Sequence, residues 1–143
     1  MKFIIYLLYL IICALILALL EIQIEGKYGW AKKLPTFKLK QKIGIKPITG
    51  YHIYFLSFTI LLIHLPLFFT GWSLKNELLI IGSWIFIWSL EDFLWFIFNP
   101  YFGLKKFNKQ NKNLWWHQSW FLGLPTFYWL VFPLAAILIS LSC

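Results

Sequence analysis

Four long apolar stretches dominate this sequence, and each is long enough to cross a lipid bilayer. They cover residues Phe3–Ile24, Tyr51–Trp72, Leu78–Asn99 and Trp120–Ser142. About 20 apolar residues in an α-helix span the ~30 Å hydrocarbon core of a membrane. A chain of 143 residues that is 61% hydrophobic cannot bury that much apolar surface in a water-soluble core. We therefore expect an all-α fold, a bundle of four transmembrane helices that forms a single domain over residues 1–143.

The lysines predict on which side of the membrane the loops lie. All 13 basic residues are lysine, and most of them fall in the segments 25–50 and 100–113. Positive charge is enriched in cytoplasmic loops, so we expect both segments to be cytoplasmic and both termini to lie outside the cytoplasm. The plasma membrane is the simplest location for such a multi-pass protein. The net charge of +8 follows from this loop bias and suits anionic headgroups, so we expect membrane lipids and no nucleic acid as partners.

The segments between the apolar stretches carry local structural signals. FKLKQKI in the first loop alternates apolar and basic residues, which predicts a short extended or surface-lying segment. Only the short turn Ser73–Glu77 separates the second and third stretches, so those helices should be antiparallel neighbours. The fourth stretch begins with an aromatic, amphipathic segment and then meets Gly123 and Pro125. We expect an interfacial helical segment there, followed by a kinked fourth helix.

Two adjacent acids, Glu91 and Asp92, interrupt the third apolar stretch. They lie roughly 11 Å inside the membrane boundary at 1.5 Å per helical residue, too deep for short side chains to reach water easily. We therefore expect them to face protein or a water-filled cavity. Steps of three or four residues place them on one broad helical face with three indoles and an amide, those of Trp84, Trp88, Trp95 and Asn99.

Two histidines lie where they could meet these acids. His52 begins the second apolar stretch and His117 precedes the fourth, whereas His64 lies nearer the outer side. We expect a polar site in the cytoplasmic half of the bundle. Its candidate catalytic residues are Glu91, Asp92, His117 and His52, and its candidate substrate-binding residues are Trp84, Trp88, Trp95, Asn99 and Trp116.

Three interpretations fit the acid pair. In the first, a carboxyl buried among indoles keeps its proton and acts as a general acid, and the indoles stabilise a carbocation by cation–π attraction. In the second, the carboxyls and two histidines bind a metal ion, but His-x-x-His, Glu-x-x-His and cysteine-pair motifs are missing from the sequence. We assign no metal ligands and identify no cofactor. In the third, the acids only fix helix register through hydrogen bonds. Intramembrane acids commonly mark functional sites, which favours the first interpretation.

Two segments resemble known membrane proteins. The stretches EDFLWFIFNPYFGLKKF and WWHQSWFLGLPTFYW, within Glu91–Trp129, resemble a set of small multi-pass bacterial membrane proteins, a likeness that implies no activity. SLEDFLWF is also similar to the integral-membrane carotenoid (lycopene) cyclase domains, in which a Pro-x-Glu-Glu motif supplies the acid that protonates a polyene. That similarity implies a proton-donating role for Glu91 and Asp92, although Ser89 and Leu90 replace the proline-containing lead-in.

These patterns predict a membrane-embedded enzyme or lipid-handling protein that acts on an apolar lipid or isoprenoid through the buried carboxyl pair. In this hypothesis Glu91 donates the proton, Asp92 or His117 is its partner, and the indoles form the pocket wall. The alternative is a non-catalytic accessory subunit of a membrane complex, because the second and third stretches carry more aromatic residues than four helices can bury. A small transporter or channel is a third hypothesis. A homo-oligomer or a larger membrane partner is compatible with all three.

Overall fold

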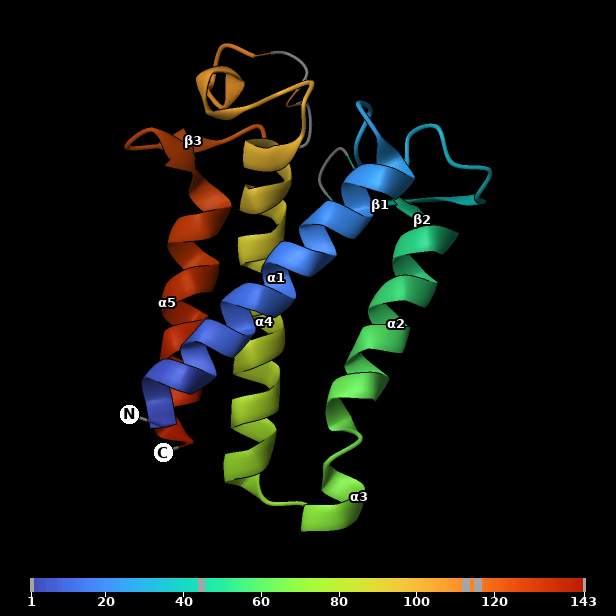
Figure 1. Ribbon diagram of the computed structural model, residues 1–143. Helices are drawn as coiled ribbons and strands as arrows, with labels where there is room; N and C mark the ends of the chain where they lie inside the picture. The colour runs from blue at the N-terminus through green and yellow to red at the C-terminus, as the bar shows by residue number, and fades with distance from the viewer. Residues whose placement is uncertain (1, 44–45, 112–113, 115–116, 143) are drawn as a thin grey trace.

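The computed structural model describes residues 2–43, 46–111, 114 and 117–142. Its long helices are α1 (Lys2–Glu25), α2 (Gly50–His64), α4 (Leu74–Phe98) and α5 (Thr126–Leu141), shown in Figure 1. The short helix α3 (Leu67–Thr70) and the 3-10 turn η1 (Leu104–Lys106) lie in the connections. Two small antiparallel sheets complete the fold, one from β1 (Lys38–Ile43) and β2 (Lys46–Thr49), the other from β3 (Trp120–Phe121) and β4 (Leu124–Pro125).

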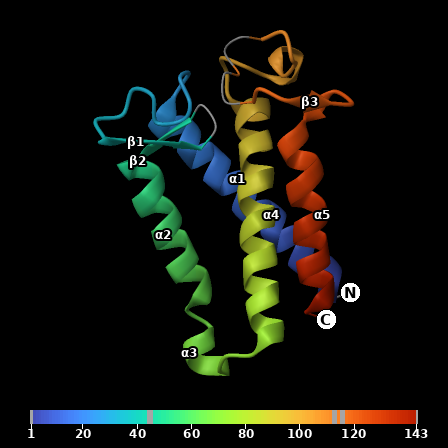
Figure 2. The same ribbon diagram turned by 180° about the vertical axis from the view of Figure 1, so that it is seen from behind.

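Helix α4 is the centre of the bundle. α1 and α5 pack extensively against it, whereas α2 makes few contacts and leans away, as Figures 1 and 2 show. α1 crosses α4 obliquely, so its last turns lie near the start of α2 (Figure 2). The described parts of the loops 26–49 and 99–125 lie together at one end of the bundle, which we call the loop end (Figure 1).

Three of the four predicted spans are confirmed as helical segments long and apolar enough to cross a membrane. They are Phe3–Glu25, Gly50–Thr70 and Leu74–Phe98, and they support a membrane protein. α5 is apolar but shorter, with 16 residues. At 1.5 Å per residue it is about 24 Å long, less than the ~30 Å hydrocarbon core.

The all-α prediction is wrong in detail, because both connections at the loop end contain short strands. β1 confirms the extended segment that the alternating FKLKQKI stretch predicted. The interfacial helix predicted before the fourth span is replaced by the β3–β4 hairpin, and the described residues 117–119 before it are not helical. Leu122 and Gly123 both have positive φ, 47° and 81°. This left-handed backbone makes a tight reversal where a helix would need negative φ.

The predicted boundaries between the second and third spans are also corrected. α4 begins at Leu74, because the Ser73 side chain accepts a hydrogen bond from the Asn76 backbone N–H and caps the helix. The second apolar stretch is divided into α2 and α3, with the break at Leu65 and Pro66. Proline lacks the N–H that a continuous helix requires. The connection is therefore longer and more structured than a simple turn.

Asn99 ties the end of α4 to the end of α1. Its Nδ2 donates to the carbonyl of Gly26 at 2.8 Å, and its Oδ1 accepts from the backbone N–H of Tyr101 at 3.1 Å. Pro100 follows directly and ends the helix. Beyond it the chain folds back over a buried aromatic core at the loop end, which contains Trp95, Phe96, Phe102, Phe107, Leu114 and Tyr128. This core positions the segment that carries His117.

The arrangement of the helices makes the predicted topology testable. We expect cysteines at Lys38 and Lys109 to be labelled by an impermeant thiol reagent from one side of the membrane, because both loops lie at the same end of the bundle. A cysteine at Lys75, at the α3 end, should be labelled only from the other side. The measurement uses cells and inverted vesicles, with Cys13 and Cys143 replaced by alanine. Labelling of Lys38 and Lys109 from opposite sides would contradict this topology.

Candidate functional site

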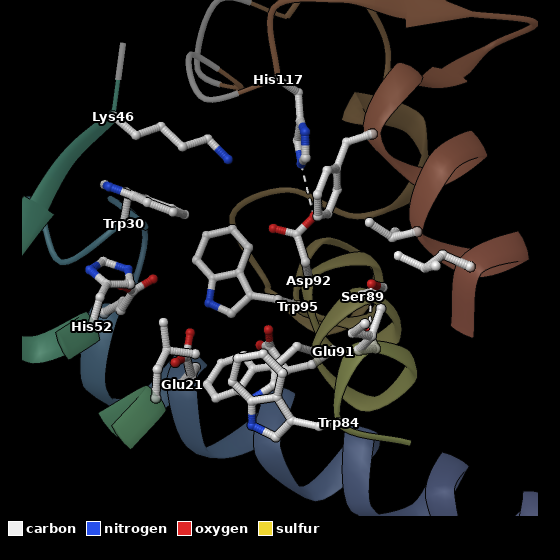
Figure 3. A pocket seen from close by; sticks show the side chains of 17 residues that line it. Glu21, Trp30, Lys46, His52, Trp84, Ser89, Glu91, Asp92, Trp95 and His117 are labelled. Carbon is white, nitrogen blue, oxygen red and sulfur yellow. Dashed lines mark hydrogen bonds and ion pairs between the residues drawn. The ribbon is translucent and has the colours of Figure 1, made fainter. Parts of the chain in front are cut away.

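A cavity of about 390 Å³ lies at the loop end of the bundle. α2, α4 and α5 surround it, and the last turns of α1 close it from behind, as Figure 3 shows. Most of its wall is apolar or aromatic. Titratable side chains from five separate segments also line it, namely Glu21, Glu25, Lys46, His52, Glu91, Asp92 and His117. The cavity therefore combines a lipid-like wall with a concentration of acid–base groups.

Asp92 is the centre of a hydrogen-bonded group of three side chains. Its Oδ2 accepts from the Tyr128 hydroxyl at 2.5 Å and lies 2.8 Å from His117 Nε2. The His117 side chain is 3% exposed and that of Asp92 is 23% exposed. Tyr128 comes from α5, so Asp92 links α4 to both α5 and the loop. A carboxylate with two donors on one oxygen is held in a fixed orientation.

The loop segment around His117 is held by aromatic packing and by its own backbone. The His117 ring lies 5.6 Å from the Phe96 ring and 6.5 Å from the Phe107 ring, measured between centroids. Its backbone N–H donates to the Leu114 carbonyl, and its carbonyl accepts from Trp120 Nε1 at 2.8 Å. The imidazole is thus fixed toward Asp92 although no helix carries it.

Glu91 differs from its neighbour in having an oxygen without a hydrogen-bond partner. The residue is only 4% exposed, and among the described residues its buried Oε1 has no partner. It lines the cavity from α4, between the indoles of Trp88 and Trp95 in sequence. A buried polar atom without a partner is costly, and such atoms are rare in folded proteins. Glu91 therefore has hydrogen-bonding capacity that the described residues leave unused.

Two further carboxyls reach the cavity from the last turns of α1. Glu21 and Glu25 are 7% and 8% exposed. The Tyr51 hydroxyl donates to Glu21 Oε1 at 2.9 Å, and Glu25 Oε1 accepts from the backbone N–H of Ala31. Sequence reasoning missed both acids as site residues because they end an apolar stretch. Their spacing of four residues, which places both on one helical face, is the signal that could have found them.

Lys46 of β2 brings a positive charge to the rim of the cavity. Its Nζ lies 4.3 Å from the centre of the Trp30 ring, and Figure 3 shows it directed inward between Trp30 and His117. Burial lowers the pKa of Lys46, and the nearby Asp92 carboxylate partly offsets that effect. Trp30 also stacks on His52, with ring centroids 4.3 Å apart. Sequence reasoning treated Lys46 as one of many loop lysines and did not consider Trp30.

The three predicted indoles all line the cavity. Trp84 donates from Nε1 to the Thr59 hydroxyl at 3.2 Å and so links α4 to α2. Trp88 packs edge to face with Phe55, their centroids 5.5 Å apart. Trp95 is the most deeply buried of the three, at 3% exposure. Together they form the α4 side of the wall.

The other predicted residues lie elsewhere. Asn99 is fully buried at the end of α4 and bridges the backbone instead of lining the cavity. Trp116 lies outside the described residues. His64 is at the opposite end, where its Nε2 lies 3.1 Å from Glu77 Oε1. His52 does line the cavity, but its Nδ1 is engaged with the Thr49 hydroxyl at 2.7 Å.

The described carboxyls and histidines do not form a metal site. Among the residues that the structure describes, no three His, Cys, Asp or Glu side chains are grouped so that they could hold a metal ion. Comparison of the chain with protein-family models, curated proteins and solved structures gives no match. The chemistry of this cavity must therefore be argued from its own geometry.

Proposed function

We propose that this protein is a membrane-embedded enzyme that isomerises or cyclises an apolar, isoprenoid-type lipid by proton transfer. One observation carries the proposal: two carboxyls in different environments share one apolar cavity. Asp92 is held by His117 and Tyr128, whereas Glu91 has an oxygen without a partner among the described residues. Paired acid–base groups whose surroundings differ are suited to separate donor and acceptor roles.

The proposed reaction starts at Glu91. Its carboxyl donates a proton to one carbon of a carbon–carbon double bond, and the adjacent carbon becomes a carbocation. The indoles of Trp88 and Trp95 stabilise that positive charge by cation–π attraction. Asp92 then takes a proton from a neighbouring carbon, which restores a double bond at a new position. Proton exchange between the two carboxyls returns the site to its starting state, so the substrate gains and loses one proton.

The surroundings of the acids support a lipid substrate. Leu56 of α2 and Val131 and Leu134 of α5 complete the wall opposite the indoles, and a cavity of about 390 Å³ falls in the range of small-molecule sites. We place this site in the cytoplasmic half of a four-span protein of the plasma membrane, with both termini outside the cytoplasm. Membrane lipids are its partners, and a second copy or a larger membrane protein is compatible with the exposed outer faces.

The test is the lipid content of cells that carry Glu91→Gln. We expect a strain that lacks the gene to accumulate one apolar lipid and lose its isomer, and Glu91→Gln to reproduce that profile. Removal of a general acid slows catalysis by about 10²- to 10⁴-fold, which depletes the product. The measurement is untargeted lipid mass spectrometry of the null strain complemented with each variant at matched protein level.

Glu77→Gln is the matched control, because Glu77 is also on α4 but lies at the far end with His64. It should restore the wild-type lipid profile. A Glu91→Gln profile identical to wild type would refute the enzyme proposal. The accessory-subunit hypothesis would then be favoured, since Phe68 and Phe69 of α3 are 85% and 86% exposed and could pack against another membrane protein.

A further inference from the structure

The charges that line the cavity do not balance. Four carboxyls, those of Glu21, Glu25, Glu91 and Asp92, face a single lysine ammonium and two imidazoles. In a low-dielectric site such an excess of acid is costly unless the acids are neutralised or a cation enters. The cavity therefore holds more acidic groups than its described basic residues can neutralise.

A second observation concerns Glu91. The buried Oε1 of Glu91 has no partner within the described chain, although the residue is only 4% exposed and lines the cavity. Glu25 and Asp92, by contrast, have their carboxyls engaged by hydrogen bonds. A cationic group in the cavity would compensate the Glu91 carboxyl, whose Oε1 is paired by none of the described residues.

The other walls favour an organic cation over a metal ion. Trp30, Trp84, Trp88 and Trp95 all line the cavity, and indole faces attract alkylammonium ions, quaternary ones included. No group of three ligating side chains among the described residues could hold a metal ion. Carboxyls beside indoles are the combination that recognises an ammonium head through charge and cation–π attraction.

The side chain of Lys46 is itself an ammonium group that fits in this cavity. Its Nζ lies 4.3 Å from the centre of the Trp30 ring and points into the cavity, as Figure 3 shows. It reaches the cavity from the β1–β2 hairpin, outside the helical bundle. An ammonium tethered at the rim would compete with a free one for the same carboxyls and indoles.

A place for an alkyl chain adjoins this site. Trp84 and Trp88 line the first cavity and also a second hollow of about 670 Å³ between α1, α2 and α4. The wall of this second hollow is mostly apolar. The two hollows therefore adjoin at these indoles. A ligand with its head beside Glu91 could extend its tail past Trp88 along α2.

We propose that the cavity is a receptor for long-chain alkylammonium amphiphiles, with the head beside Glu91 and the indoles, and with Lys46 as a built-in competitor. The inference goes beyond the proton-transfer function, because a quaternary ammonium carries no N–H and needs no double bond to bind. An enzyme that stabilises a carbocation would share this preference for cations, but ammonium binding does not require that the protein catalyses any reaction.

The test is equilibrium binding of radiolabelled dodecyltrimethylammonium to the full-length protein in nanodiscs of zwitterionic lipid. Empty nanodiscs measure partition into the bilayer. We expect saturable binding that unlabelled dodecyltrimethylammonium displaces. Its uncharged carbon isostere, 2,2-dimethyltetradecane, and tetramethylammonium, which has the head without the tail, should each compete at least about tenfold less well.

Two substitutions should move the affinity in opposite directions. Glu91→Gln should weaken binding about tenfold or more, because glutamine cannot release a proton and become a carboxylate when the ammonium enters. Lys46→Gln should strengthen binding by about tenfold, because it removes a repelling charge. A misfolded protein cannot bind more tightly, so the second variant keeps the test valid if the first is unstable. Glu77→Gln should leave the affinity unchanged.

Three results would overturn the proposed receptor: no saturable binding, equal competition by the uncharged isostere, or binding in Lys46→Gln that is no tighter than in wild type. Each can be told apart from failure of the enzyme proposal. Ammonium binding without a change in the lipid profile of Glu91→Gln cells indicates a cation receptor that is not a lipid isomerase. A changed lipid profile without ammonium binding keeps the enzyme and removes this inference.

Discussion

Replacing Phe96 with alanine should lower the free energy of unfolding by about 3 to 5 kcal/mol, the range for truncating a buried aromatic residue. Phe96 is completely buried, and its ring lies 4.9 Å from that of Phe107 and 5.6 Å from that of His117, measured between centroids. The cavity left behind would remove the packing that fixes the loop against α4. The measurement is denaturation by sodium dodecyl sulfate in mixed micelles, followed by circular dichroism.

Phe98→Ala is the matched control for this change. Phe98 lies two residues further along the same helix but is 48% exposed, so its loss should cost less than about 1 kcal/mol. We also expect Phe96→Ala to weaken dodecyltrimethylammonium binding, because the cavity-lining indole of Trp95, whose ring lies 5.2 Å from that of Phe96, loses its support. Equal destabilisation by the two alanines would show that the aromatic core at the loop end does not hold this fold together.

Replacing Gly82 with leucine should separate α5 from α4, with a cost of about 3 kcal/mol from overpacking. A Cβ atom at Gly82 would lie 2.9 Å from Leu138 Cβ and from Ile139 Cγ1, and 3.1 Å from the carbonyl oxygen of Ala135. Small residues allow the close helix contacts on which membrane bundles depend. Displacement of α5 would also carry Tyr128 away from Asp92. The same denaturation assay measures the loss.

Ala136→Leu provides the comparison, since Ala136 belongs to the same helix α5 but is exposed, so the added side chain does not have to enter the packed interior. Its stability should stay within about 0.5 kcal/mol of wild type. Gly82→Ala should fall between wild type and Gly82→Leu. If Gly82→Leu were as stable as Ala136→Leu, the close contact between α4 and α5 would be contradicted.

Much of the helical framework could be predicted because the apolar stretches are long and uninterrupted. Length and composition alone predicted the helices α1, α2 and α4, since a backbone in lipid must satisfy its hydrogen bonds within a helix. The residues at which the helices begin and end were less predictable. Helix α4 begins after the side-chain cap at Ser73 and ends before Pro100. A cap formed by one hydroxyl cannot be recognised in a hydropathy pattern.

The candidate site could be predicted only in part, because it is made by segments that are distant in the chain. Helical spacing put Glu91, Asp92 and the three indoles on α4 together, and the structure brings His52 and His117 to the same cavity. The roles of these residues stay predictions. Glu21 and Lys46 were missed, since the oblique crossing of α1 and the β1–β2 hairpin that bring them to the cavity are tertiary features.

The sequence by itself determined that this chain forms long apolar helices with basic loops at one end and a pair of acids inside the third helix. These properties follow from local composition and periodicity, which act within a few turns of one segment. Only the tertiary structure decided that Asp92 meets His117 and Tyr128 and that two acids of α1 join them. It also decided that one Glu91 oxygen has no partner among the described residues. Those contacts depend on how helices cross and where loops fold back, because the packing of side chains from distant segments sets both.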